Sequence, residues 1–438
     1  MQELYEARRR RFLESMGPRA VAVIPSAPVA VRNNDVEHEY RQDSDFFYLT
    51  GLDEPESVLI LSTAHPDQRT VLFVRPRNPE REIWDGPRAG VEGAKADFGA
   101  DVAFDVKDYE RKLPDYLAGA DTVFFRPGLD RAHDDKLFRG MDMARRRHRN
   151  RTAFPTAIVD PGTRLHEHRL IKSDEEVAIM RRAAEVSERA HRAALRLAAP
   201  GRYEFEVEAE ILGIFRAAGC ERPAYGPIVG SGPNATILHH RKNDRRMEDG
   251  DLLLIDAGCE LEYYASDVTR TFPVNGRFTR AQRAIYDLVL KAERTCVAAA
   301  KPGADLDAIH ELAVRVLTEG LVALGLVTGP LDEAIAEERY KPFYMHRTSH
   351  WLGMDVHDVG LYYVDGKPRP LEPGMVFTIE PGLYIGVDAD VDPAYRGIGV
   401  RIEDDILVTE AGRENLTESI PSDPDEIESL MSTAAAAE

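Results

Sequence analysis

The sequence predicts an α/β N-terminal domain followed by a larger α+β C-terminal domain with pseudo-two-fold symmetry. Three observations support this fold class. The chain has 438 residues, which is too long for one ordinary hydrophobic core. Its first third alternates short apolar runs with amphipathic segments. The remainder combines long amphipathic helices with two similar strand-and-turn segments. We expect the domains to span residues 1–168 and 169–438, because a helix-capping pattern follows the boundary segment 165–172.

Short apolar runs alternate with helical patterns in the N-terminal domain. Strands are predicted at residues 20–24, 57–61, 70–74 and 122–125, and helices at 107–117 and 130–145. This alternation favours an α/β domain.

The C-terminal domain begins with a long helix. Ser173 and Glu176 form a capping box that predicts a helix from about 174 to 199, which Pro200 and Gly201 end. Thr279 to Gln282 is a second capping-box candidate, which predicts a helix from 280 to about 300. Further helices are predicted at 204–218 and 305–324, strands at 251–256, 264–272, 375–379 and 399–408, and a short fraying helix within 422–438. Helices and strands are therefore both present but do not alternate regularly.

Two twelve-residue segments of this domain resemble each other. Met247–Gly258 can be laid over Leu371–Gly382 at a constant offset of 124 residues, and each contains a turn, an apolar strand and a carboxylate before a second turn. Asp256 and Glu380 occupy the equivalent carboxylate positions. Such an internal repeat predicts two related halves whose strand ends meet in one place.

Four carboxylates and a histidine cluster lie on or next to these strands. Asp267 follows Asp256 by eleven residues, in a predicted hairpin partner strand, and Glu403 lies in a late strand. His346, His350 and His357 fall within twelve residues. An oxygen-rich set with an imidazole suits hard divalent cations such as manganese or cobalt, and cations would relieve repulsion among the acids.

Each residue also has a simpler interpretation. Asp256 could be a solvated turn residue, Asp267 could pair with Arg270, and Glu403 could belong to a solvated acidic rim with Asp404 and Asp405. His350 could be an ordinary core or surface histidine, and His239-His240 a plain loop pair. The conjunction of all of them with the internal repeat favours a metal site.

Five motifs around these residues resemble the aminopeptidase P family, which shares the pita-bread fold with prolidase and methionine aminopeptidase. The motifs are Leu254–Cys259, Ser266–Pro273, Ser349–Asp358, Thr378–Tyr384 and Gly399–Asp405. The resemblance extends to Tyr40–Gly51 and Glu82–Trp84 in the N-terminal domain. One departure is Arg347, where many relatives carry glycine and where arginine is expected to narrow the rim of the site.

The resemblance implies a two-metal centre, with manganese favoured. Its ligands would be Asp256, Asp267, His350, Glu380 and Glu403. Asp267 and Glu403 would bridge both ions, and a bridging water would lose its proton to become the nucleophile. Glu380 would take that proton and pass it to the leaving nitrogen.

Further residues receive roles through the same resemblance. His239 and His357 would hold the substrate and stabilise the intermediate, and His346 would line the pocket. Arg401 would orient a carboxylate or substrate group. Tyr384 would lie near the proton path, with a core tyrosine as the alternative. Trp84 would reach a neighbouring subunit's site, with a buried core tryptophan as the alternative.

The implied activity is hydrolysis of the N-terminal Xaa-Pro bond of peptides by a cytoplasmic homo-oligomer, a dimer or tetramer. Prolidase, which cleaves only Xaa-Pro dipeptides, is the alternative. A non-catalytic pita-bread module and a creatinase-like hydrolase are weaker ones. A net charge of −20 disfavours nucleic-acid binding. No apolar run reaches membrane-spanning length, the N-terminal segment lacks a signal-peptide core, and three cysteines without a CxxC pair indicate reduced thiols.

Overall fold

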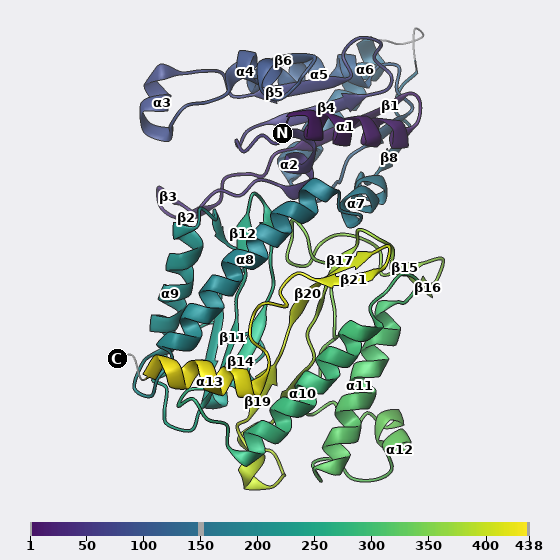
Figure 1. Cartoon of the computed structure of the whole chain (residues 1–438). Coiled ribbons are helices and arrows are strands. Elements are labelled where there is room, and N and C mark those ends of the chain that lie inside the picture. The colour runs from purple at the N-terminus through teal and green to yellow at the C-terminus, as the bar shows by residue number, and fades with distance from the viewer. Residues whose placement is uncertain (1, 148–152, 436–438) are drawn as a thin grey trace. The chain divides into compact units, whose positions relative to one another are not determined.

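The four predicted strands of the N-terminal part belong to one six-stranded sheet. The computed structural model describes residues 2–147 and 153–435, and the chain divides into two compact units, Met1–His168 and Arg169–Glu438 (Figure 1). The sheet of the first unit has the order β6-β5-β4-β1-β7-β8 and mixes parallel and antiparallel pairs. Its strands are β1 (Ala20–Pro25), β4 (Val58–Ser62), β5 (Thr70–Val74), β6 (Val102–Asp105), β7 (Thr122–Phe124) and β8 (Ala157–Val159).

Helices surround this sheet in the first unit. The predicted helices are present as α5 (Tyr109–Leu117) and α6 (Arg131–Arg147), whose apolar sides pack on the sheet. The sequence interpretation missed α1 (Gln2–Met16), α2 (Ser44–Thr50), α3 (Pro79–Asp85), α4 (Gly90–Ala96) and α7 (Gly162–Leu170), as well as the short strands β6 and β8. The domain is therefore α/β, as predicted.

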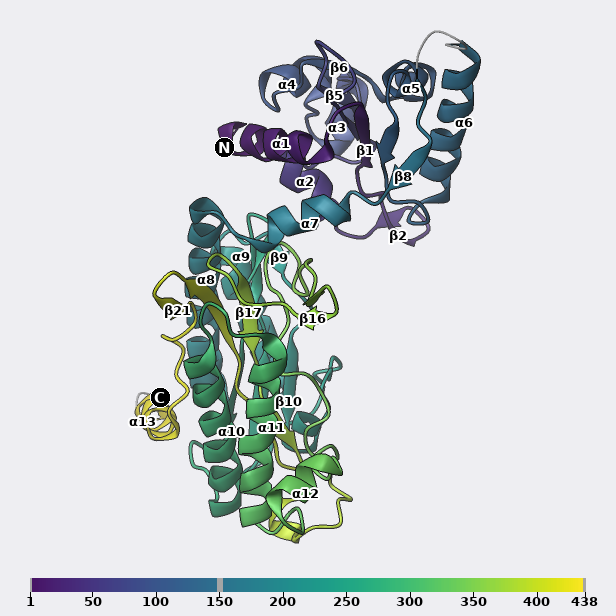
Figure 2. The same cartoon turned by 90° about the vertical axis from the view of Figure 1, so that its right-hand side faces the viewer.

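The second unit contains two pairs of packed helices. Both predicted capping boxes are confirmed: Ser173 with Glu176 begins α8 (Asp174–Leu197), and Thr279 with Gln282 begins α10 (Arg280–Ala299). Helix α9 (Glu204–Ala217) packs on α8, and α11 (Leu306–Ala323) packs on α10 (Figure 2). One continuous apolar core joins both pairs to the strands.

The internal repeat coincides with two antiparallel strand pairs. Strand β11 (Leu252–Asp256) pairs with β14 (Thr269–Pro273), and β17 (Val376–Ile379) pairs with β20 (Asp404–Thr409). On the other side of β11 lies β10 (Ile228–Ser231). Each half thus supplies a helix pair and a strand pair, which is the α+β arrangement expected of the pita-bread fold.

Two predicted strands are interrupted, and both interruptions hold a candidate ligand. The segment 264–272 divides into β13 (Tyr264–Ala265) and β14, with Asp267 between them, because β13 pairs with β12 (Cys259–Leu261) while β14 pairs with β11. The segment 399–408 divides in the same way around Glu403. Strand β19 (Gly399–Arg401) pairs with β18 (Gly382–Tyr384), whereas β20 pairs with β17.

A short helix ends the described chain. The tail prediction is confirmed as α13 (Pro424–Ala435), and residues 436–438 of that prediction lie outside the described part.

Candidate metal centre

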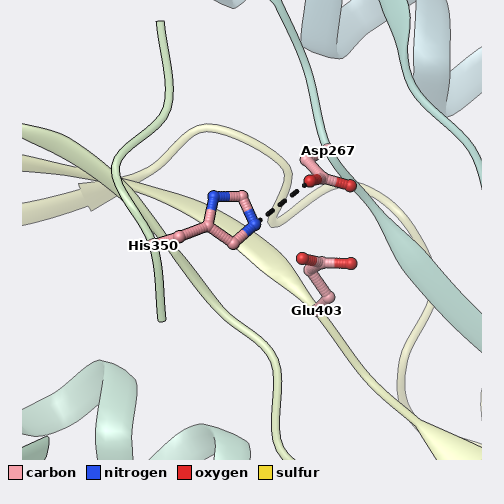
Figure 3. Close-up of side chains that lie close together, drawn as sticks. All are labelled: Asp267, His350 and Glu403. Carbon is pink, nitrogen blue, oxygen red and sulfur yellow. Dashed lines mark ion pairs between the residues drawn. The ribbon is translucent and has the colours of Figure 1, made fainter. Parts of the chain in front are cut away.

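Three ligand candidates lie close together at the junction of the two halves. One ligand atom each of Asp267, His350 and Glu403 lies within 4.8 Å of the others, and all three side chains point into one space (Figure 3). Nε2 of His350 lies 3.4 Å from Oδ2 of Asp267 and 3.6 Å from Oε1 of Glu380. Asp267 from the first half of the repeat, and His350, Glu380 and Glu403 from the second half, therefore approach one point.

Backbone pairing places His350 beside this point. The N–H of Thr378 donates to the carbonyl of His350, and the N–H of Glu380 donates to the carbonyl of Thr348. Through its Nδ1 the imidazole contacts the carbonyl of Trp351 at 3.1 Å, so its Nε2 faces the carboxylates. The loop thus acts as a further strand beside β17 and fixes the ring.

Asp256, in the first half of the repeat, is connected to the other candidate ligands through Arg401 of the second half. The guanidinium of Arg401 forms an ion pair with Oδ2 of Asp256 and donates to the hydroxyls of Thr269 at 3.0 Å and Tyr384 at 3.1 Å. Thr269 in turn donates to Glu403 at 2.6 Å. Arg401 therefore holds the carboxylate of Asp256, a candidate ligand from the other half of the repeat.

Burial of so many acids raises their pKa values. Burial is the main cause for Asp256, Glu380 and Glu403, and neighbouring carboxylates add to it; the pKa of Glu380 rises to about 7. Burial opposes the charged form of His350, but the hydrogen bond and charge of Asp267 raise its pKa to about 9. Asp405, buried beneath Asp267, also has a raised pKa because of burial and the charge of Asp267.

The donor set fits hard divalent cations. Oδ1 of Asp256 is buried and accepts no hydrogen bond from any residue that the structure describes. Four carboxylates repel one another here, and Arg401 compensates only part of that charge. Divalent cations at this point would satisfy the unpaired oxygen and remove the repulsion.

Three more histidines lie around the carboxylates. Nδ1 of His346 is 3.8 Å from Oε2 of Glu380, and its Nε2 contacts the Tyr384 hydroxyl at 2.9 Å. The rings of His350 and His357 lie 4.2 Å apart. Burial is the main cause that lowers the pKa of His346, to about 4, and that of His357; the charge of His239 contributes to both shifts. The structure therefore places His346 beside Glu380 and His357 beside His350, and the charge of His239 acts on both His346 and His357.

Several simpler interpretations are wrong. Asp404, Asp405 and Glu403 are buried, so they do not form a solvated rim. Arg270 pairs with Asp404 rather than Asp267. Trp84 is 83% exposed, which excludes a core tryptophan.

The sequence interpretation missed some contributors. Tyr225 donates to Oδ1 of Asp267, Thr269 bridges Arg401 and Glu403, and Asp405 accepts the N–H of Asp267. Thr269 and Asp405 lie two residues after Asp267 and Glu403, which is the spacing of one face in the continuous strands that the sequence predicted, and this spacing was an available signal. Tyr225 precedes β10 and gave no signal.

Arg347 points to helix α11. It forms an ion pair with Asp307, which also accepts a hydrogen bond of 2.6 Å from Tyr363. The departure noted in the sequence therefore links the histidine loop, α11 and the hairpin β15–β16 (Tyr363–Val364 and Lys367–Pro368).

Fold and donor set together define a metallopeptidase. Residues 178–410 match the model of metallopeptidase family M24, and residues 5–124 match that of the aminopeptidase P N-terminal domain. The chain belongs to metallopeptidase family M24, as the motifs predicted.

Similar proteins cover nearly the whole chain. The Xaa-Pro aminopeptidase of Escherichia coli is 46% identical over 98% of both chains, and that of Haemophilus influenzae is 41% identical over 98% of this chain and 97% of its own. Pseudomonas aeruginosa aminopeptidase PepP superposes with a TM-score of 0.98 at 50% identity, covering 100% of this chain and 99% of its own. A glutamate-to-alanine variant of Escherichia coli aminopeptidase P in complex with substrate superposes with a TM-score of 0.96 at 45% identity, covering 99% of each chain.

No helix in residues 2–147 or 153–435 is both long enough and apolar enough to span a bilayer.

Proposed function

We propose that this chain is a metal-dependent aminopeptidase that hydrolyses the N-terminal Xaa-Pro bond of peptides. The observation that carries the proposal is the convergence of Asp267, His350 and Glu403, with Glu380 and Asp256 adjoining, inside a family M24 fold. The names of the similar proteins support the substrate class.

Five residues would hold two divalent cations, with manganese favoured by the oxygen-rich donor set. They are Asp256, Asp267, His350, Glu380 and Glu403. When bound, the cations would activate a water nucleophile and polarise the scissile carbonyl.

The remaining chemistry belongs to the chain's own side chains. Glu380 lies 3.6 Å from His350 and 3.8 Å from His346, so it would be placed to transfer a proton from water to the leaving nitrogen. His346 is held by Tyr384 beside Glu380 and would line the pocket. His239 and His357, both exposed, would contact the substrate.

Arg401 would keep Asp256 ionised and aimed at the metals. Its ion pair with Asp256 and its bond to Thr269 tie both halves of the repeat to the ligand set. Tyr384, which contacts both Arg401 and His346, would complete the proton path.

Proline at the second position follows from the chemistry of its nitrogen. A prolyl nitrogen carries no hydrogen and its ring is rigid, so a peptidase that accepts it must not depend on that hydrogen bond. Prolidase shares this requirement but acts on dipeptides, whereas the similar proteins named above are Xaa-Pro aminopeptidases.

Parallel assays of Xaa-Pro-Yaa and Xaa-Pro peptides with manganese test the proposal. We expect hydrolysis of the tripeptide, and activity on the dipeptide alone would instead identify a prolidase. Asp267→Asn should lose metal and activity, whereas Asp332→Asn, an 86% exposed aspartate on α12 (Leu331–Ala336), should retain both. Equal behaviour of the two variants would indicate a non-catalytic module.

We also propose a cytoplasmic homo-oligomer, a dimer or tetramer. Ile83 and Trp84 are 82% and 83% exposed on α3, which suits contact with another subunit. Cys220, Cys259 and Cys296 are free and buried, which suits a reducing compartment. Sedimentation of the wild type and of a Trp84→Ala variant tests the assembly, and a monomeric wild type would contradict it.

A further inference from the structure

Helix α8 holds the segment that joins two of the ligand aspartates. Residues 257–266 connect Asp256 to Asp267, and α8 packs against β12 and β13 of this connection. In Figure 1 the helix passes across β12. Two fully or almost fully buried polar side chains of α8, Ser187 and His191, contact the two ends of this segment.

His191 contacts the end next to Asp256. Its Nε2 lies 3.0 Å from the carbonyl oxygen of Ala257. A carbonyl oxygen only accepts, so Nε2 must carry the proton and donate. Burial is the main cause that lowers the pKa of His191 to about 4, so the imidazole is neutral and offers this single N–H.

Ser187 contacts the end next to Asp267. Its hydroxyl lies 2.7 Å from the hydroxyl of Ser266, which also accepts the N–H of Cys259 at 3.2 Å. Ser187 and His191 are one helical turn apart, so they lie on the same face of α8. One face of α8 therefore forms hydrogen bonds with Ala257, which follows Asp256, and with Ser266, which precedes Asp267.

The two ends of the segment also pack tightly on each other. A Cβ atom at Gly258 would lie 1.7 Å from the carbonyl oxygen of Ser266, so only glycine fits there. Ala257 donates its N–H to the carbonyl of Val268 at 3.0 Å. The segment is thus a compact unit, and a shift of either end moves an aspartate.

The hydrogen bonds from Ser187 and His191 matter because Asp256 and Asp267 repel each other. Both aspartates are buried, and their like charges lie in one site. Two carboxylates under such repulsion relax apart unless the backbone that carries them is held. The contacts from α8 act on that backbone directly.

We propose that Ser187 and His191 are positioning residues that set the spacing of Asp256 and Asp267 and thereby the metal affinity of the site. The inference rests on the proposed metal centre. It concerns residues that lie outside the ligand set and outside the histidine cluster.

Manganese titration of the metal-free protein by calorimetry tests this role. Outer contacts of metal ligands typically change affinity by about 10–100-fold, so Ser187→Ala and His191→Leu should bind manganese at least about 10-fold more weakly. His191→Gln keeps an N–H donor in a similar place and should recover most of the affinity. Thr318→Val removes a buried hydroxyl on α11, far along the chain from both aspartates, and should bind as the wild type does.

The outcomes separate the two proposals. Wild-type protein that binds no manganese would overturn the metal centre and this inference with it. Wild-type binding together with unchanged affinity in Ser187→Ala and His191→Leu would overturn the positioning role alone. So would a His191→Gln variant as weak as His191→Leu. If His191→Leu does not fold, Ser187→Ala, which removes one buried oxygen, decides the question.

Discussion

The buried ion pairs of Asp358 hold the loop that carries His350 and His357. Oδ1 of Asp358 accepts from Arg169 at 2.7 Å, and Oδ2 accepts from Lys172 at 2.9 Å. The side chains of Asp358 and Lys172 are each 1% exposed. We expect Asp358→Asn to destabilise the second unit strongly, because it leaves the Lys172 ammonium buried without its partner.

The size of the effect follows from the burial. Removing one member of a buried ion pair costs about 3–5 kcal/mol, because the remaining charge keeps its desolvation penalty. Arg169 retains Asp355 at 2.7 Å, so most of the cost comes from Lys172. The double variant Lys172→Met with Asp358→Asn should therefore be more stable than Asp358→Asn alone, since no unpaired ammonium remains.

Tryptophan fluorescence during urea unfolding measures the free energy of unfolding of the wild type and of both variants. The chain has two tryptophans: Trp84 is already 83% exposed, whereas Trp351 is fully buried and its carbonyl accepts the N–H of Asp358 at 2.9 Å. The change in emission on unfolding therefore reports on the region of interest. A free energy of unfolding for Asp358→Asn within about 1 kcal/mol of the wild type would refute this reasoning, as would a double variant less stable than Asp358→Asn.

Three further predictions test other parts of the second unit. Burial, followed by the charge of Asp404, raises the pKa of Glu293 to about 8, above its ordinary value of 4.5. Below pH 4.5 the carboxyl group is protonated in both the folded and the unfolded state, and the free energy of unfolding has its full value. As the pH rises from 4.5 through 8, only the unfolded state releases the proton readily, so the free energy of unfolding falls by up to about 5 kcal/mol. Glu293→Gln should flatten the melting temperature of the metal-free protein between pH 5 and 9, and an unchanged slope would contradict this. Gly258→Ala should weaken manganese binding, because the new Cβ would clash with Ser266, and a calorimetric affinity equal to the wild type would be inconsistent with that contact. Chelation with EDTA should lower the melting temperature of the loaded protein, since a cation at 100 times its Kd contributes about 2.7 kcal/mol; identical melting curves would count against a bound metal.

Local signals in the sequence predicted much of the fold. The capping boxes at Ser173 and Thr279 fixed where two long helices begin, because the bonds of a capping box join residues only three apart. Apolar runs such as 252–255 predicted strands for a similar reason. Short strands such as β8, with three residues, carry too little pattern to be recognised.

Long-range pairing could not be read in the same way. The breaks at Asp267 and Glu403 arise because the chain exchanges one partner strand for another, and no local pattern marks that exchange. The pairing of Arg270 with Asp404 likewise joins residues 134 positions apart. The candidate ligands were identified because their surroundings resemble known motifs, and the structure brings Asp267, His350 and Glu403 together, whereas Tyr225 gave no signal.

The contacts of the ligands explain why the site exists only in the assembled unit. Three carboxylates or their backbones are bound by a group from the opposite half of the repeat. The pairs are Asp256 with Arg401, the N–H of Asp267 with Asp405, and Glu403 with Thr269. Neither half alone could bury these carboxylates with the same partners, and an unpaired buried charge is very costly. Docking of the two halves therefore brings the candidate ligands together. The repeat at an offset of 124 residues places one carboxylate of each half, Asp256 and Glu380, at this junction.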